Sequence, residues 1–577
     1  MQLVDSWRLF GPNLQTRGPA ALAEVRFDEG EDVARAVDAW RAELLRMAVA
    51  IGLDVRDAAA RVYRGGAVLT FSAPLDRLLP ATDVNEWAVT SASSLLQGGL
   101  ALSLEPRRTE LMTALAARAN PLWLALEAEG AARGVPFLWD DESVTLGAGR
   151  YSRTWPLDAL PTVAVVPWGE LRAIPIALVT GTNGKTTSVR LLARLLELAG
   201  HAVGMTTTDG VSVAGRVVEA GDYTGPAGAL RALRAPEIDA AVLETARGGI
   251  LRRGLVVSAP NVALLTNVSD DHLGHYGIDD LAALARVKAV VGSVVPPSGR
   301  VVVNADDVYL MDHARSFVAP LALFSLDPAS AVLAAHQAQG GETWTIADGW
   351  VVRTRGAEEH RVVQATDISI GFGGAAPYNL ANALGAAASA SALGVSDAVI
   401  AKGLASFTSS AVDNPGRGNL GDVRGVRVLV DFAHNPAGIR GVLAFVARLQ
   451  QADGRLLVVA GYSGDRSHES IRDAARAIAD AHPIAVVLRD LRGYLRGRAP
   501  GEVPALLRAA LEEGGLSPDA IDVAPTEADA LRWALSLARP GDIVVVLAHL
   551  ETQEVQTVLA ESRSGEGEAA ETLTRVK

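Results

Sequence analysis

A glycine-rich loop between an apolar strand and a helix is the strongest chemical signal in this 577-residue sequence. The loop has the sequence Thr-Gly-Thr-Asn-Gly-Lys-Thr-Thr over residues 180–187 and follows the apolar run at 174–179. Gly181 and Gly184 allow backbone angles at which the N–H groups of residues 182–185 turn toward phosphate oxygens. The helix that follows would add the positive end of its dipole. The loop therefore predicts a cradle for nucleotide phosphates.

Side chains of the same loop fit this role. Lys185 can neutralise the β- and γ-phosphates, and the short Thr186 hydroxyl can enter the shell of an octahedral Mg²⁺ ion. The general P-loop pattern has a further glycine where this chain has Val179. A fortuitous turn before a surface helix is the alternative, but strand and helix fall on the correct sides of the loop. The residues expected to bind the nucleotide here are Gly181, Thr182, Asn183, Gly184, Lys185, Thr186 and Thr187.

Further candidate side chains follow two other apolar strands. Glu244 ends the run at 239–243, and His272 lies six residues beyond the strand at 261–266. Transfer of a phosphoryl group to a carboxylate brings two anions together and requires metal ions, whose hard oxygen ligands should lie near the loop. Lys288 follows His272 by sixteen residues within a predicted helix. A lone histidine or lysine is ordinarily a core or surface residue, so the ordered set carries the prediction.

The composition describes a globular protein of several domains. Hydrophobic residues make up 49% of the chain and charged residues 21%, and the length predicts about three or four domains. The net charge of −13 disfavours nucleic acid as a partner. No apolar run reaches the ~20 residues that span a bilayer, so no membrane partner is expected. The absence of cysteine excludes disulfides and thiolate chemistry and is compatible with the cytoplasm, where we expect the protein.

The pattern of strands and helices predicts an α/β protein of three units and a tail. Residues 1–170 form a mixed α+β unit. Residues 171–415 alternate strands and helices, which predicts a unit whose central parallel sheet carries the phosphate loop. Residues 416–560 do the same and predict a Rossmann-like, doubly wound sheet, whose ligands sit beyond the carboxyl ends of its strands. The polar residues 561–577 predict a disordered tail.

The phosphate loop resembles that of the Mur ligase family, whose members form amide bonds with ATP, and this resemblance gives other residues their roles. It implies two Mg²⁺ ions, the second held by Glu244 and His272. It also implies that Lys288 is carbamylated by carbon dioxide, which converts a cation of reference pKa about 10.4 into an anion. A solvated helix lysine is the alternative. The implied catalytic residues are Lys185, Glu244, His272, Lys288 and Arg417, and the implied metal ligands are Thr186, Glu244, His272 and Lys288.

Motifs later in the chain match further family positions. Asn379, in Tyr-Asn-Leu-Ala-Asn, matches the residue that hydrogen-bonds adenine, although an asparagine at the start of a helix can equally be its N-cap. Arg417, Asp431 and His434 resemble contacts to ribose and phosphate from the carboxy-terminal unit. Arginine suits a transferring phosphoryl group because its guanidinium pairs with two oxygens at once. Turn formation is the structural alternative for Asp431.

Longer segments resemble the cyanophycin synthetase branch of these ligases. They cover residues 204–210, 221–226, 244–252 and 267–274. A shorter match at residues 8–14 extends the resemblance to the amino-terminal unit. That branch has an ATP-grasp domain between its two parts, whereas here the first unit leads almost directly into the phosphate loop. The chain would therefore supply only the reaction of the Mur-like site, unless a separate ATP-grasp ligase acts with it.

The combined pattern predicts an ATP-dependent ligase that activates a carboxylate as an acyl phosphate and joins it to an amine, such as an amino acid, in a cyanophycin-like or related peptide pathway. A P-loop kinase or nucleotide switch is one alternative, and an inactive binding subunit beside an ATP-grasp enzyme is another. A homo-oligomer is compatible with the sequence. The residues assigned to the carboxylate are Thr207, Thr208, Asp209 and Arg247, and those assigned to the amine are Asp465 and Arg466.

Overall fold

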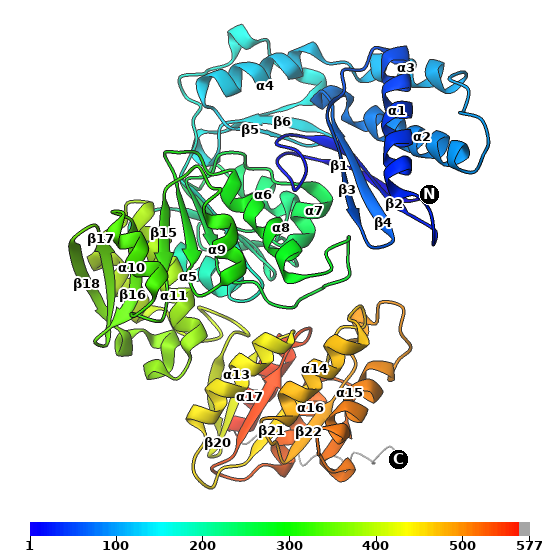
Figure 1. Ribbon diagram of the computed structural model, residues 1–577. Helices are drawn as coiled ribbons and strands as arrows, with labels where there is room; N and C mark the ends of the chain where they lie inside the picture. Colours follow the sequence, from blue (N-terminus) through cyan, green and yellow to red (C-terminus); the bar gives the residue numbers. More distant parts are fainter. Residues whose placement is uncertain (565–577) are drawn as a thin grey trace.

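The computed structural model describes residues 1–564, whose strands form four sheets (Figure 1). An eleven-stranded sheet occupies the middle of the chain and a six-stranded sheet follows it, while two smaller sheets of four and three strands belong to the amino-terminal part. The amino-terminal and carboxy-terminal parts lie on different sides of the central one. None of the helices in residues 1–564 combines the length and the apolar character that crossing a bilayer requires.

The amino-terminal unit packs helices against an antiparallel sheet of order β1-β2-β4-β3. Its core contains Trp40 and Phe71, and the buried Trp40 indole donates a hydrogen bond to Asn85 (2.8 Å). The first sheet and its helices are β1 (Gln2–Leu9), β2 (Ala20–Arg26), α1 (Val33–Ile51), β3 (Arg56–Tyr63), β4 (Gly66–Ser72), α2 (Leu78–Leu96) and α3 (Arg107–Arg118). The next helix, α4 (Pro121–Arg133), packs against the second sheet. The second, antiparallel sheet consists of β5 (Phe137–Trp139), β6 (Ser143–Leu146) and β7 (Arg153–Pro156).

The central sheet is built around β8 (Ile176–Thr180), which is buried on both faces. Ile176 and Leu178 pack in one hydrophobic core, whereas Ala177 and Val179 pack in the other, because successive strand residues face opposite sides. Helices α5 (Lys185–Leu198), α11 (Pro377–Ala392) and α12 (Asp397–Ser406) supply residues to the second core. The first core takes residues from α6 (Pro226–Leu233), α7 (Arg247–Arg253), α8 (Leu281–Ser293) and α9 (Val308–Ala314).

The predicted central parallel sheet is a mixed one. Seven neighbouring strands, in the order β9-β12-β8-β13-β14-β15-β16, pair in parallel, and antiparallel hairpins extend both edges. The alternation of strands and helices in the sequence does not predict these added strands, because antiparallel strands are joined by short turns without a crossover helix. The parallel strands besides β8 are β9 (Val203–Thr207), β12 (Ala240–Glu244), β13 (Val262–Leu265), β14 (Arg300–Asn304), β15 (Leu321–Phe324) and β16 (Glu342–Ala347). The edge strands are β10 (Gly210–Val213), β11 (Arg216–Ala220), β17 (Trp350–Arg355) and β18 (Glu358–Gln364), and α10 (Ala331–Ala338) joins β15 to β16.

The carboxy-terminal sheet has the order β19-β20-β24-β21-β22-β23, parallel except for the edge strand β19. Cores on both faces of this sheet fit the predicted doubly wound fold class. Its strands are β19 (Asn419–Val423), β20 (Val426–Asp431), β21 (Leu456–Ala460), β22 (Ala485–Leu488), β23 (Ile521–Val523) and β24 (Ile543–Leu547). Its helices are α13 (Pro436–Leu449), α14 (His468–Ala479), α15 (Glu502–Glu513), α16 (Glu527–Leu537) and α17 (Thr552–Ser564).

The start of the predicted tail at residue 561 is wrong, because α17 continues to Ser564. Val555, Val558 and Leu559 are buried at helical spacing in the core beside α16, which holds this helix on the sheet. The remainder of the predicted tail, residues 565–577, lies outside the described residues. The other predicted domain boundaries stay predictions.

A buried ion pair in the carboxy-terminal unit yields a stability prediction. Arg489 and Glu527 are 0% and 2% exposed and lie 2.6 Å apart, and Glu527 also accepts hydrogen bonds from the N–H groups of Leu550 and Glu551. Arg489→Ala should lower the free energy of unfolding by about 3–5 kcal/mol, since it leaves a buried carboxylate without its cation. Urea unfolding measures this.

The matched control removes an exposed partner from the same unit. Arg476→Ala breaks the pair with Asp473 on α14, where the arginine side chain is 58% exposed, and should cost less than about 1 kcal/mol. Equal losses for the two variants would contradict the prediction.

Candidate functional site

The phosphate loop lies at the carboxyl end of β8 and leads directly into α5, which begins at Lys185. Gly184 has φ +83°, and a Cβ there would lie 2.1 Å from the Asn382 side-chain oxygen on α11. A Cβ at Gly181 would lie 1.8 Å from the Thr266 hydroxyl. Both glycines are therefore required by close packing as well as by backbone angle.

The loop backbone differs from the prediction that the N–H groups of residues 182–185 all turn toward phosphate oxygens. The N–H groups of Thr182 and Asn183 donate to the carbonyl and the side-chain oxygen of Asn267 (2.8 and 2.9 Å), which follows β13. Thr266 and Asn267 in turn donate to the Asn183 carbonyl (2.7 and 3.0 Å). The strand next to β8 thus fixes the first half of the loop, and these two N–H groups do not face a ligand.

Glu244 lies beside the loop because it ends β12, the other neighbour of β8, in register with Val179. The carboxylate is 2% exposed and accepts a hydrogen bond from the Thr186 hydroxyl (2.9 Å). Burial raises the pKa of Glu244, and the charge of Lys185 opposes this rise. Within residues 1–564 its other oxygen, Oε1, has no hydrogen-bond partner. A buried oxygen without a donor, next to a hydroxyl, fits a hard divalent cation.

A cavity of about 410 Å³ joins the loop to the carboxy-terminal unit. Its lining brings together the phosphate loop, Glu244 and Asn379 with Arg417, Asp431 and His434. Asn379 donates to the Ile370 carbonyl (3.0 Å), and the N-cap position of α11 is Ala376, so the N-cap alternative for Asn379 is wrong. Burial raises the pKa of Asp431 to about 6, against the attraction of Arg417.

Arg417 connects the cavity to the predicted carboxylate-binding residues. Its guanidinium lies over the Phe432 ring (4.0 Å) and donates to the Thr208 hydroxyl (3.2 Å), which itself lies 3.3 Å from Thr186. Asp209 is 3.9 Å from Arg417 and forms a closer pair with Arg190 (2.8 Å). The predicted residue Thr207 is buried instead, and its hydroxyl accepts the Asp209 N–H (3.1 Å) in the turn after β9.

An amide pair that sequence reasoning missed connects the loop to the carboxy-terminal unit. Asn435 donates to the side-chain oxygen of Asn183 (2.8 Å), and Asn183 donates back (3.3 Å). Asn435 is also the N-cap of α13, where it accepts the Gly438 N–H (2.9 Å). Its only sequence signal is the N-cap residue before Pro436, which predicts a helix start and not this contact.

A second set of charges lies around Asp271, another residue that was missed. Arg466 of the carboxy-terminal unit pairs with Asp271 (2.6 Å), and His434 approaches the same carboxylate (3.9 Å). Burial opposes ionisation of Asp271, but His434 and Arg466 outweigh it and hold the pKa well below its usual range. Burial lowers the pKa of the adjacent His272 to about 3. His272 Nδ1 lies 3.5 Å from Asp465, so the predicted residues Asp465 and Arg466 both meet the central unit here.

Lys288 is 3% exposed on α8, which excludes the solvated-lysine alternative. Burial and the charge of Lys185 lower its pKa well below the usual value, while Asp271 opposes this shift. These interactions connect Lys288 to both the phosphate loop and the Asp271 cluster. The individual roles of the predicted site residues stay predictions.

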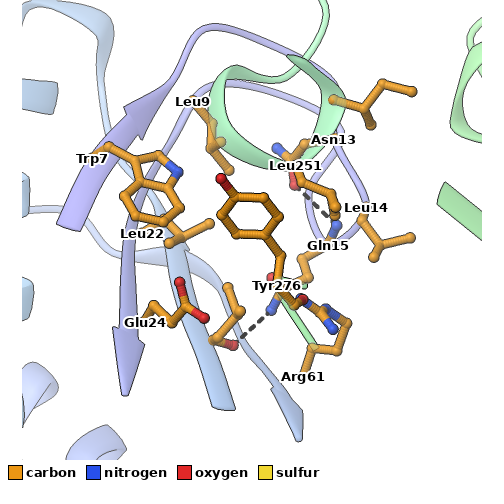
Figure 2. A pocket seen from close by; sticks show the side chains of 12 residues that line it. Trp7, Leu9, Asn13, Leu14, Gln15, Leu22, Glu24, Arg61, Leu251 and Tyr276 are labelled. Carbon is orange, nitrogen blue, oxygen red and sulfur yellow. Dashed lines mark hydrogen bonds between the residues drawn. The ribbon is translucent and has the colours of Figure 1, made fainter. Parts of the chain in front are cut away.

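The amino-terminal unit holds the loop that carries His272, at residues 272–277. Arg61 on β3 donates to the carbonyls of Tyr276 (2.7 Å) and Gly277 (2.8 Å). Figure 2 shows the Tyr276 ring among Trp7, Leu9 and other apolar side chains of this interface. At the other end of the loop, Arg247 donates to the His272 carbonyl (2.6 Å). The sequence predicts that Arg247 binds the substrate carboxylate.

This loop has a strained backbone. His272 and Tyr276 adopt left-handed conformations with φ +55° and +56°. Such angles cost about 1–3 kcal/mol for residues other than glycine and persist where surrounding contacts over-determine them. The hydrogen bonds from Arg61 and Arg247 are contacts of this kind.

Comparisons with known proteins agree with this geometry. The Mur ligase middle domain matches residues 179–390, and the Mur ligase glutamate ligase domain matches residues 416–550. UDP-N-acetylmuramoyl-L-alanyl-D-glutamate--2,6-diaminopimelate ligase of Corynebacterium glutamicum is 30% identical over 387 residues, which are 64% of this chain and 69% of that protein. A structure of Escherichia coli FolC with ADP has the same fold over 68% of this chain and 90% of FolC (TM-score 0.51, 20% identity).

A further relative is longer than this chain. Cyanophycin synthetase of Synechocystis sp. is 38% identical over 400 residues, which are 69% of this chain and 45% of that protein. The chain thus spans about half the length of the cyanophycin synthetases that it matches.

Loss of the Arg61 contacts should loosen the loop without unfolding the protein. In Arg61→Ala, hydrogen–deuterium exchange of residues 272–278 should rise at least tenfold, because the carbonyls of Tyr276 and Gly277 lose their donors. Arg64→Ala changes an exposed arginine of the same hairpin and should leave this exchange unchanged. Equal protection of the loop in both variants would show that Arg61 does not hold it.

Proposed function

Because the chain belongs to the Mur ligase family, we propose that it is an ATP-dependent ligase that joins a substrate carboxylate to an amine and releases ADP and phosphate. One observation carries this proposal. A single cavity joins a phosphate loop and a buried, half-satisfied carboxylate, Glu244, to an arginine and a histidine from a second unit. A phosphate loop alone would suit a kinase or a switch equally well.

The nucleotide is held between the central and carboxy-terminal units. Residues 182–187 surround the phosphates, and the N-terminus of α5 adds favourable potential for anions. Asn379 reaches the adenine, and Asp431 and His434 contact the ribose and phosphates. Lys185 and Arg417 stabilise negative charge on the γ-phosphoryl group as it transfers.

The reaction proceeds by two displacements. A carboxylate oxygen of the substrate attacks the γ-phosphorus, and the bond to ADP breaks to give an acyl phosphate. The amine nitrogen then attacks the acyl carbon and loses a proton, and phosphate leaves with the former carboxylate oxygen. Arg417 donates to Thr208 and lies beside Asp209, and these three residues together orient the carboxylate. Asp465 and Arg466 recognise the amino acid that supplies the amine.

Two divalent cations fit the donors of this site. Thr186 and Glu244 offer hydroxyl and carboxylate oxygens beside the phosphates. The family resemblance adds His272 and carbamylated Lys288 as the further ligands of this proposal. Mg²⁺ would neutralise the phosphate oxygens and so reduce the repulsion between the two anions that react. Burial leaves one Glu244 oxygen without a hydrogen-bond donor among residues 1–564, so this oxygen is available to bind a cation.

We propose that Lys288 is carbamylated, and its surroundings support this modification. Burial and Lys185 favour the neutral amine, which is the form that attacks carbon dioxide. An N–C bond forms, one proton leaves the nitrogen, and the product is an anionic carbamate. This anion would compensate the positive charge of Lys185 and offer oxygen ligands to a metal.

The substrate class is an amino acid joined to a peptide carboxylate, in a cyanophycin-like or related pathway. The similarity to cyanophycin synthetases over residues that include both units supports this class. A separate ATP-grasp ligase would supply the backbone of such a peptide.

The test combines single amino acids with short aspartyl peptides, ATP and Mg²⁺, and reads amide product by mass spectrometry and ADP by coupled assay. A ligase should turn over ATP repeatedly only when a carboxylate and an amine are both present. ATP turnover without an amine acceptor would favour a kinase or switch, and an inert chain that binds an ATP-grasp partner would favour a binding subunit.

Lys288→Ala should reduce the ligase rate about 10- to 100-fold, since it removes a group that orients the metal site. Short carboxylic acids such as acetate should restore part of the rate by replacing the carbamate. The control Lys402→Ala changes an exposed lysine on α12 and should have the same ligase rate as the chain without substitutions. A ¹³C carbamate signal from ¹³CO₂ that Lys288→Ala lacks would identify the modification, and an unchanged rate would reject the role.

A further inference from the structure

We propose that His272, His275 and Asp465 form a binding site for a late first-row transition-metal ion, with Zn²⁺ as the representative, at the junction of the central and carboxy-terminal units. The site shares His272 with the proposed Mg²⁺ ligands, but its other two ligands, His275 and Asp465, are not among them. Only its expected effect on catalysis rests on the proposed function.

The geometry of the three side chains carries the proposal. One ligand atom of each residue lies within 4.8 Å of the other two, and His272 Nδ1 is 3.5 Å from the Asp465 carboxylate. The two imidazoles meet edge to face with ring centroids 5.8 Å apart. Zn²⁺ binds such ligands at about 2.0–2.2 Å, so tetrahedral donors lie about 3.3 Å apart. Small side-chain rotations would bring the three donors to that spacing.

The backbone that presents these side chains is already fixed. Arg247 holds the His272 carbonyl, and Arg61 holds the carbonyls of Tyr276 and Gly277. His275 pairs with Ile278 in an isolated bridge, and its Nε2 lies 3.1 Å from the Asp465 carbonyl. A site whose ligands are held by other contacts loses little conformational entropy when it binds an ion.

The chemistry of the ligand set selects the kind of ion. Two imidazoles and one carboxylate suit Zn²⁺ or its neighbours better than Mg²⁺, which prefers oxygen ligands. Arg466, the nearby cation of the carboxy-terminal unit, pairs more closely with Asp271 (2.6 Å) than with Asp465 (3.9 Å), while Arg247 donates to a carbonyl. All three ligand residues are partly exposed, so an ion can enter and a water can complete a four-coordinate site.

Occupation of this site would have two consequences. The ion would connect the His272 loop of the central unit to Asp465 of the carboxy-terminal unit, and so oppose their separation. It would also remove His272 from its proposed role beside Glu244. Zn²⁺ should therefore inhibit the ligase at concentrations far below that of Mg²⁺.

The experiment titrates the full chain with Co²⁺, whose visible absorption bands report tetrahedral nitrogen and oxygen ligands, and then displaces it with Zn²⁺. The unmodified chain should bind one Co²⁺ per chain with these bands. His275→Ala should weaken binding at least tenfold, whereas His360→Ala, which changes an exposed histidine on β18, should not. Circular dichroism checks that each variant is folded, and His275→Gln replaces His275→Ala if the latter is not.

Absence of the bands in the unmodified chain, or equal affinity in the His275 variant, would overturn the proposal. In the ligase assay with saturating Mg²⁺, micromolar Zn²⁺ should slow the unmodified chain and spare His275→Ala. The Co²⁺ spectrum requires no turnover, so it decides the metal site even if the chain proves to have no ligase activity.

Discussion

The parallel pairing of β8 with β12 and β13 is the constraint on which the rest of the site depends. It places Glu244 and Asn267 on either side of the phosphate loop at one end of the sheet, where each forms a hydrogen bond with the loop. Because side chains alternate along a strand, a slip of one residue in β12 would turn Glu244 to the opposite face. Two buried cores, one on each side of β8, oppose such a slip.

Charge balance is the second theme of the site. Glu244, Asp271 and Lys288 are largely removed from water, where isolated charges are unfavourable. Asp271 is compensated by Arg466 from the other unit, whereas Glu244 and Lys288 have shifted pKa values in the directions that reduce their charge. A site with this pattern is prepared for added ions, because cations and phosphates would supply the missing partners.

The sequence predicted the parts of the site that depend on local pattern. Gly181, Lys185, Glu244 and the fold class follow from strand ends and loop chemistry, which are readable over a few residues. The contacts between units could not be predicted in this way: Asn183 meets Asn435, and Arg61 meets Tyr276, across more than two hundred residues of chain. The antiparallel edges of the central sheet were missed for a different reason, because short hairpins carry no crossover helix to signal them.

The loop at residues 272–277 is in contact with all three units, since Arg61 approaches it from one side and Asp465 from the other. The conformation of this loop therefore depends on contacts from all three units. Recombination that exchanged the amino-terminal unit for an unrelated fold would leave two backbone carbonyls without donors and a tyrosine without its apolar surroundings. Viable chimeras of this protein should therefore be restricted to donors that carry an arginine equivalent to Arg61, or that redesign the loop at the same time.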